Sequence, residues 1–119
     1  CSCAVVVNGV GCRAIANRRP DRKLVAARQL SSQGVDLLSR SQLQAAEQCF
    51  ETAIEQCPTD ERAHWGVAQT LWMAHRNEEA IAHMQEAIRL SGSNPEYLAR
   101  LGEMYLELNR PAEALRISE

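Results

Sequence analysis

Apolar positions along this chain recur every three to four residues, which is the spacing of amphipathic helices rather than of strands. The segment 34–58, GVDLLSRSQLQAAEQCFETAIEQCP, shows the pattern most clearly and predicts two amphipathic helices joined by a short turn. The same order of helix, turn and helix continues over residues 61–94 and again from residue 95. We therefore expect an all-α fold.

This helix pair recurs with a period of 34 residues. Small residues fall on small residues and large apolar residues on large ones, as packed helix pairs require. The aligned positions are Gly34, Ala68 and Gly102; Leu37, Leu71 and Tyr105; Ala46, Ala80 and Ala114; Phe50 and Met84; Ala53 and Ala87; Ile54 and Ile88. A 34-residue period is the signature of the tetratricopeptide repeat, and the chain resembles that family over about three quarters of its length.

The resemblance implies a right-handed superhelix of antiparallel helix pairs. Two full repeats, about 27–60 and 61–94, would be followed by a partial third at 95–119, so that the repeat domain covers 24–119 and a leader or linker covers 1–23. The pattern stops at Glu119, about halfway through a helix. We interpret this as a fragment of a longer array or a frayed terminus, with an exposed face that a further repeat would cover.

Residues that favour helix ends predict the helix boundaries. The first helix is expected from near residue 24 to about residue 40, with apolar and small residues facing inward. Ser41 followed by Gln44 has the spacing of a capping box for the helix at 43–56. The other expected caps and first-turn prolines are Thr59 or Asp60, Asn77, Pro95 and Pro111.

Charge is unevenly distributed along the chain, although the formal net charge is only −2. Residues 1–28 carry six of the 13 basic groups against Asp21 alone, and the remainder holds 14 of the 15 acidic groups. A basic segment before acidic repeats favours either an anionic lipid or nucleic-acid surface, or simply a soluble linker. The acidic repeats argue against nucleic acid.

The N-terminal residues CSCAVVVNGVGCRAIANRRP lie outside the repeat pattern. The apolar run 4–12 is too short to span a membrane, and it resembles the end of a secretory signal that precedes a lipidated cysteine in bacterial lipoproteins. Cys12 is the first candidate for lipidation and Cys1 the second, although Gly9 departs from the Leu or Val of that motif. The alternative is a disordered leader. The protein is accordingly expected either at a bacterial cell envelope or in the cytoplasm.

The sequence gives no support for catalysis, a metal or a cofactor. Cys1, Cys3 and Cys12 lack the ligand spacing of a zinc site, and Cys49 and Cys57 are too far apart along one helix to form a disulfide with each other. The histidines show neither an H-E-x-x-H pattern nor a neighbouring phosphate-binding loop. We expect a protein that is not an enzyme and has no small-molecule substrate.

The resemblance implies that the first helix of each repeat lines a concave groove that binds a protein or peptide. Arg28 and Arg62 would stand at one end and Glu103 and Glu107 at the other, and Trp65 is open to either a packing role or a groove role. The groove residues carried over onto this chain are Arg28, Ser31, Val35, Arg62, Trp65, Gln69, Trp72, Met73, Glu103 and Leu106. Trp and Arg are typical of interface hot spots. The alternative function is a structural segment that self-associates or packs on further repeats, without a groove ligand.

Overall fold

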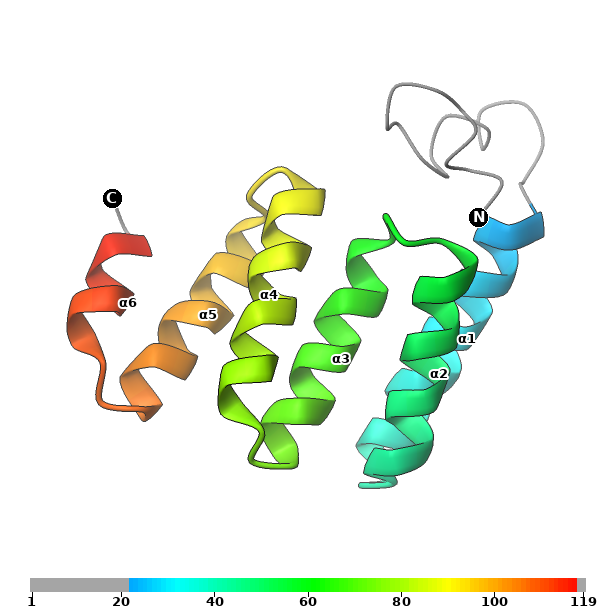
Figure 1. Ribbon diagram of the computed structural model, residues 1–119, viewed down its shortest axis with the longest axis horizontal. Helices are drawn as coiled ribbons and strands as arrows, with labels where there is room; N and C mark the ends of the chain where they lie inside the picture. The colour runs from blue at the N-terminus through cyan, green and yellow to red at the C-terminus, as the bar shows by residue number, and fades with distance from the viewer. Residues whose placement is uncertain (1–21, 118–119) are drawn as a thin grey trace.

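The computed structural model describes residues 22–117, and this part of the chain contains six α-helices and no strand. The helices are α1 (Arg22–Ser39), α2 (Leu43–Gln56), α3 (Glu61–Met73), α4 (Asn77–Ser91), α5 (Pro95–Glu107) and α6 (Pro111–Ile117). Figure 1 shows them as consecutive antiparallel pairs, with α1 beside α2, α3 beside α4 and α5 beside α6. The all-α repeat architecture is confirmed.

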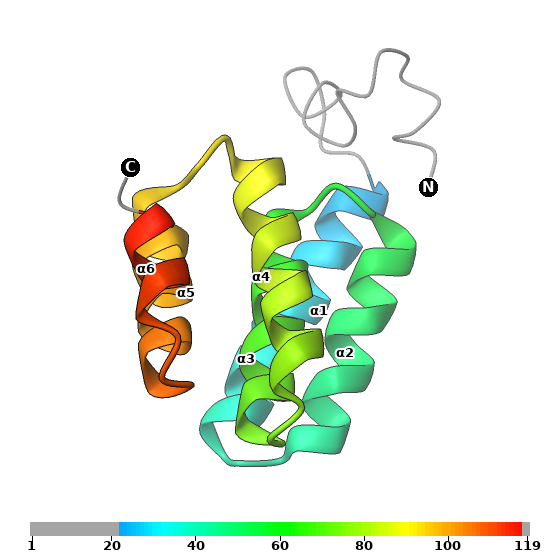
Figure 2. The same cartoon turned by 60° about the vertical axis from the view of Figure 1, so that its left-hand side comes forward.

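The pairs stack side by side along the long axis of the molecule. The most extensive packing lies within the pairs α1–α2 and α3–α4, and α2 also packs on α3. The pair α5–α6 continues the row beyond α4 (Figure 2). Since α1 also contacts α3, the first helices of successive repeats share one face.

A phenylalanine fills the seam between the first two repeats. Phe50 on α2 is completely buried. A Cβ atom built on Gly34 of α1 would lie 2.6 Å from its ring, and one built on Gly66 of α3 would lie 2.2 Å from it. Both distances are far below a normal carbon–carbon contact, so the ring fits only because two glycines face it. The small residue expected at position 34 thus has a direct steric cause.

Two apolar clusters form the interior of the described residues. The larger runs from Ala46 and Phe50 through Leu71 and Met84 to Tyr105, and so spans all three repeats. The smaller joins the start of α1 to the end of α2 and the start of α3, and consists of Leu24, Ala27, Ala53, Cys57 and Ala63. Cys57 is the buried C-terminal cap of α2, whereas Cys49 is a half-buried free cysteine. The buried residues of both clusters agree with the apolar and small residues that are expected from the sequence to face inward.

The turns inside the three repeats share one backbone geometry, although their residue types differ. Ser41, His75 and Asn109 lie 34 residues apart, and each has positive φ, between 57° and 62°. Each turn also has the two hydrogen bonds of a Schellman motif; in the second repeat, Arg76 N donates to Leu71 O at 2.9 Å and His75 N to Trp72 O at 3.0 Å. The residue that ends the first helix therefore recurs as regularly as the core.

Two of the expected helix caps, Ser41 and Asn77, are wrong because of this turn geometry. Ser41 serves as the left-handed residue after α1, so it cannot cap α2, which begins after Gln42 without a side-chain cap. Asn77 is already the first residue of α4 and follows Arg76. Asp60 does act as a cap, and so does Asn94, which was not among the expected caps; each side chain accepts a hydrogen bond from the backbone N–H two residues on.

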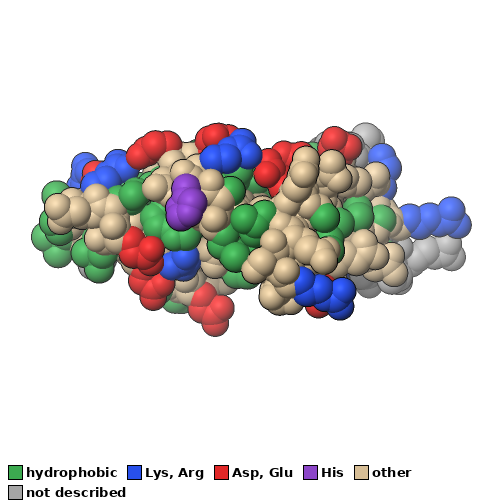
Figure 3. Space-filling model, turned by 90° about the horizontal axis from the view of Figure 1, so that it is seen from below, with side chains coloured by type: hydrophobic (Ala, Val, Ile, Leu, Met, Phe, Trp, Pro, Cys, Tyr) green, Lys and Arg blue, Asp and Glu red, His purple; other side chains and the backbone are tan. Residues whose placement is uncertain are grey.

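Arginines just after the left-handed residues connect neighbouring repeats. Arg76 contacts Glu47 of the preceding repeat at 3.1 Å and Glu79 in its own helix at 2.7 Å. One period later, Arg110 contacts Glu78 of the preceding repeat at 2.8 Å and also pairs with Glu113. Viewed from the turn edge, acidic and basic side chains lie beside each other along the molecule with apolar groups between them (Figure 3). These ion pairs are exposed.

Candidate functional site

The first helices of all three repeats line one hollow of about 440 Å³, which we call the Trp65 hollow. It brings together five of the ten groove residues expected from the sequence: Arg28, Ser31, Val35, Arg62 and Trp65. Their convergence follows from the repeat, because equivalent positions on successive first helices lie side by side. Ser32, Glu96 and Tyr97 also line the hollow and were missed, since none stands out by type or spacing.

Trp65, Tyr97 and Val35 form the apolar part of the Trp65 hollow, and its other five lining residues are polar or charged. Trp65 is half-buried, lines the hollow and also packs on the larger apolar cluster, so it has the packing role, and its groove role stays a prediction. Val35 is 44% exposed at the surface of α1. Burial and the neighbouring carboxyls of Glu61 and Asp60 raise the pKa of Tyr97, which therefore keeps its hydroxyl proton at neutral pH.

One polar atom in the Trp65 hollow lacks a partner. Ser31 is only 5% exposed, and its hydroxyl makes no hydrogen bond within the structure described. Burying a hydroxyl without a partner costs about 1–3 kcal/mol, and this oxygen is itself shielded from solvent, so a ligand polar atom reaches it only if neighbouring side chains move.

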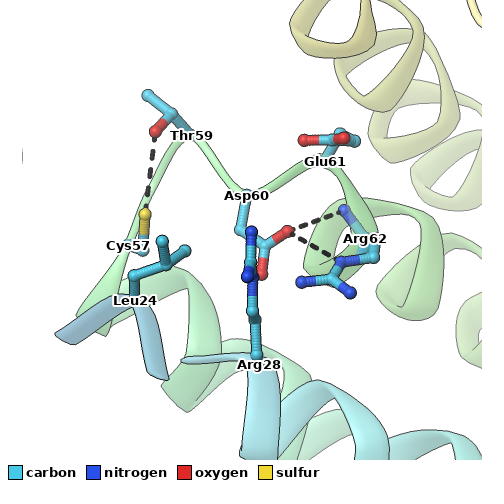
Figure 4. A pocket seen from close by; sticks show the side chains of 7 residues that line it. All are labelled: Leu24, Arg28, Cys57, Thr59, Asp60, Glu61 and Arg62. Atoms are coloured by element: carbon cyan, nitrogen blue, oxygen red, sulfur yellow. Dashed lines mark hydrogen bonds and ion pairs between the residues drawn. The ribbon is translucent and has the colours of Figure 1, made fainter. Parts of the chain in front are cut away.

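Positive charge gathers at one end of the Trp65 hollow. Arg28 and Arg62 line it and also line a neighbouring hollow of about 250 Å³ around Asp60 (Figure 4). Asp60 Oδ1 accepts from the backbone N–H of Arg62 at 3.1 Å and lies 3.6 Å from its guanidinium, whereas its buried Oδ2 has no hydrogen-bond partner. Arg28 extends from α1 toward the same loop. Arg28 and Arg62 thus lie at the same end of the Trp65 hollow, where Asp60 neutralises part of their charge.

A second group of expected residues is organised by Arg100 on α5. Arg100 Nε donates to Gln69 Oε1 at 3.1 Å, and its guanidinium carbon lies 5.8 Å from the centre of the Trp72 ring. Its Nη1 lies 3.1 Å from Glu103 and 3.5 Å from Glu107. The acidic end is therefore partly neutralised, and the sequence reading missed Arg100. The three-residue spacing of Arg100 and Glu103 was the available signal.

The remaining two expected residues lie elsewhere. Met73, the last residue of α3, is exposed and does not line the Trp65 hollow. Leu106 is 60% exposed and lies with Glu103 in a separate apolar hollow of about 600 Å³ between α5 and α6, the α5–α6 hollow. Its lining is Pro95, Leu98, Ala99, Gly102, Glu103, Leu106, Pro111, Ala114, Leu115 and Ile117.

Two predictions concerning the N-terminal segment lie outside the described residues: lipidation at Cys12 or Cys1, and the leader over 1–23 apart from its last two residues. In the segment 22–117, no helix is sufficiently long and apolar to cross a membrane.

Comparisons with known proteins agree with this geometry. A family model for the tetratricopeptide repeat matches residues 32–95 and 74–117. Among solved structures, a MamA structure comprising residues 41 to the end, from Desulfovibrio magneticus RS-1, is similar with a TM-score of 0.70 and 23% sequence identity, over 88% of this chain and 57% of that chain. A double mutant of MamA from RS-1, named ArsTM, gives a TM-score of 0.69 over the same shares.

At this identity the two structures show a shared fold alone. The chain spans little more than half the length of either MamA chain. No curated protein matches the chain.

Proposed function

The chain belongs to the tetratricopeptide repeat family, and from this premise we propose that it binds an extended segment of a partner protein along the face shared by α1, α3 and α5. The family and fold support a protein-interaction scaffold, a class of protein that is ordinarily not enzymatic. The finer proposal, binding at the Trp65 hollow, rests on the geometry of this chain.

The observation that carries the proposal is the composition of the Trp65 hollow. Two aromatic side chains, Trp65 and Tyr97, converge with Val35 and two arginines from three helices in one place. Interfaces concentrate their binding energy in such aromatic and arginine clusters. The surface continues past Gln69 and Trp72 to the Arg100 ion pairs, which gives a ligand both apolar and charged contacts.

Two valines on the same helix provide a matched test. Val35 lines the hollow and is 44% exposed, whereas Val25 is 40% exposed and does not line it. Peptides would be selected with the unmodified chain from a displayed library of random peptides, then synthesised and titrated by calorimetry. Val35→Glu should weaken binding at least about tenfold, or 1.4 kcal/mol, while Val25→Glu should not. Equal affinity for both variants would refute binding at the Trp65 hollow.

A second candidate function is self-association through the α5–α6 hollow. Leu106 and Leu115, 60% and 64% exposed, lie on this apolar surface, which is the kind of patch that a further helix or a second copy covers. Sedimentation velocity over a range of concentrations tests this candidate. Concentration-dependent dimerisation that Leu115→Glu abolishes would support it, and a constant monomer mass would reject it.

A membrane tether at Cys12 or Cys1 stays part of the proposal. One acyl chain gives only marginal anchoring, so the basic residues that follow would act as a second attachment to anionic lipid. The intact mass of the protein from native membrane and soluble fractions tests this. Added acyl mass on a species beginning at either cysteine would place the scaffold at a cell envelope, and an unmodified soluble species would remove the tether.

A further inference from the structure

Two histidines face each other across the seam between α3 and α4, away from the Trp65 hollow. His64 Nδ1 and His83 Nδ1 lie 3.4 Å apart, and the ring centres are 5.6 Å apart. Both side chains are half-buried, and a small hollow of about 160 Å³ beside them is lined by His64, Ala82, His83 and Glu86. Nothing in the proposed scaffold role requires this pair.

The backbone fixes the protonation of one ring. His64 Nε2 lies 3.1 Å from the carbonyl oxygen of Pro58, and because a carbonyl only accepts, Nε2 must carry the proton. The lone pair of neutral His64 is therefore on Nδ1, facing His83. A backbone carbonyl on the far nitrogen is also the arrangement that orients histidines in metal sites.

The separation of the two nitrogens matches shared coordination of one ion. Nitrogens bound at about 2.0–2.1 Å to a tetrahedral zinc ion lie roughly 3.3–3.4 Å apart, and the observed separation is 3.4 Å. Without an ion, His83 Nδ1–H would donate to His64 Nδ1. Binding requires only that this proton move to His83 Nε2, which leaves the ring neutral and both Nδ1 lone pairs directed at the ion.

Three carboxylates lie around the histidine pair, each paired with an arginine. Glu86 lines the hollow and pairs with Arg89. Glu47 and Glu79 also lie near His83, where they pair with Arg76.

We propose that His64 and His83 form a binding site for a borderline divalent cation of the zinc type, with water completing the coordination and the Glu86–Arg89 pair beside it. Over residues 22–117, no group of three or more His, Cys, Asp or Glu side chains is placed to hold a metal ion, so the two histidines are the protein ligands of the proposed site. The site is thus a two-histidine clamp that holds α3 to α4, and its occupancy adds to the stability of the second repeat by mass action.

Calorimetric titration of the full chain with ZnCl2 tests the site, and His75 provides the control. His75 is exposed on the turn after α3, so His75→Asn should bind as many zinc ions as the unmodified chain. His64→Gln/His83→Gln should bind one equivalent fewer, and zinc should raise its Tm less. Zinc bound elsewhere on the chain is common to all variants and cancels in this difference. MgCl2 should give no such difference, because Mg²⁺ prefers oxygen ligands.

The outcome that overturns the proposal is equal zinc stoichiometry and affinity in the double variant and the His75 control. If the double variant loses helical circular dichroism, Glu86→Gln takes its place. That change is confined to a carboxylate already paired with Arg89 on the surface of α4, and it should weaken zinc binding without loss of helix. Unchanged affinity in Glu86→Gln would then count against the site.

Discussion

The same substitution, Gly→Ala, should have opposite effects at two helical glycines of this chain. At Gly66 the new Cβ would lie 2.2 Å from the ring of Phe50, which is completely buried. At Gly102 nothing lies within 4 Å of the new atom. The structure thus separates the steric effect of a methyl group from its effect on helix propensity.

The expected magnitudes follow from these distances. Replacing a helical glycine by alanine stabilises a helix by about 0.5–1 kcal/mol. Gly102→Ala should gain this amount, which raises Tm by roughly 2–8 °C for a domain of this size. At Gly66 the Phe50 ring must move by more than about 1 Å within a close-packed core, and such overpacking costs about 1–3 kcal/mol. Gly66→Ala should therefore be destabilising overall.

Urea unfolding followed by circular dichroism at 222 nm measures both effects. The slope with denaturant should be unchanged, so a shift in the midpoint reports stability. Adding Phe50→Leu to Gly66→Ala should recover part of the loss, since the shorter side chain removes the clash. If Gly66→Ala is as stable as the unmodified chain, or if Phe50→Leu gives no recovery in that background, the reasoning from the Phe50 seam is wrong.

Three further predictions concern turns, pH and capping. His75→Gly should stabilise the chain by about 1 kcal/mol in thermal unfolding, because His75 has φ of 62°, whereas Gly92→Ala should destabilise it by a similar amount at φ of 70°; equal effects of the same sign would contradict the turn geometry. The pKa of His83 is lowered in the fold, so its contribution to stability is complete above the ordinary value of about 6.5 and falls as the pH drops below it. The free energy of unfolding of the unmodified chain should therefore decrease toward that of His83→Gln between about pH 7.5 and 5.5, and a constant difference would disprove this. Asp60→Ala should cost about 1 kcal/mol through loss of the α3 cap, while Asp60→Asn, which keeps the accepting oxygen, should cost less in the same urea assay.

The fold could be predicted because its main determinant is periodic. A packed helix pair needs small and large residues at set positions, and Gly34, Phe50 and Ala46 recur in kind one period later. Gly66 is as essential to the Phe50 seam as Gly34, yet its equivalents at 32 and 100 are serine and arginine. A residue such as Gly66, which is required by one particular neighbour, is not repeated at the equivalent positions of other repeats, so the period does not reveal it.

The turns show a second limit of reading the sequence. Ser41, His75 and Asn109 share a backbone conformation but no side-chain chemistry, because hydrogen bonds of the backbone define the motif. The serine at 41 therefore looked like a cap for the next helix. A single residue such as Ser41 could either cap the next helix or end the preceding one. The backbone hydrogen bonds to the preceding helix determine which of the two roles it has.

Part of the candidate site could be predicted because equivalent positions of successive repeats lie on the same face. Register places Arg28, Val35 and Trp65 on one face, and the Trp65 hollow includes all three. Arg100 instead contacts Gln69 and Trp72, about one repeat away. These contacts depend on the directions of the side chains, which residue spacing alone does not specify. Whether these residues bind a partner stays a prediction.

The arginines that link neighbouring repeats have a consequence for the response of the joints to salt. Each joint between repeats combines an apolar seam, which salt hardly weakens, with exposed ion pairs of Arg76 or Arg110 that salt screens over about 10 Å at 0.1 M. Exposed pairs of this kind contribute at most about 1 kcal/mol, too little to determine folding. Higher salt should therefore weaken the ion-pair part of each joint and leave the apolar seam and the helices intact.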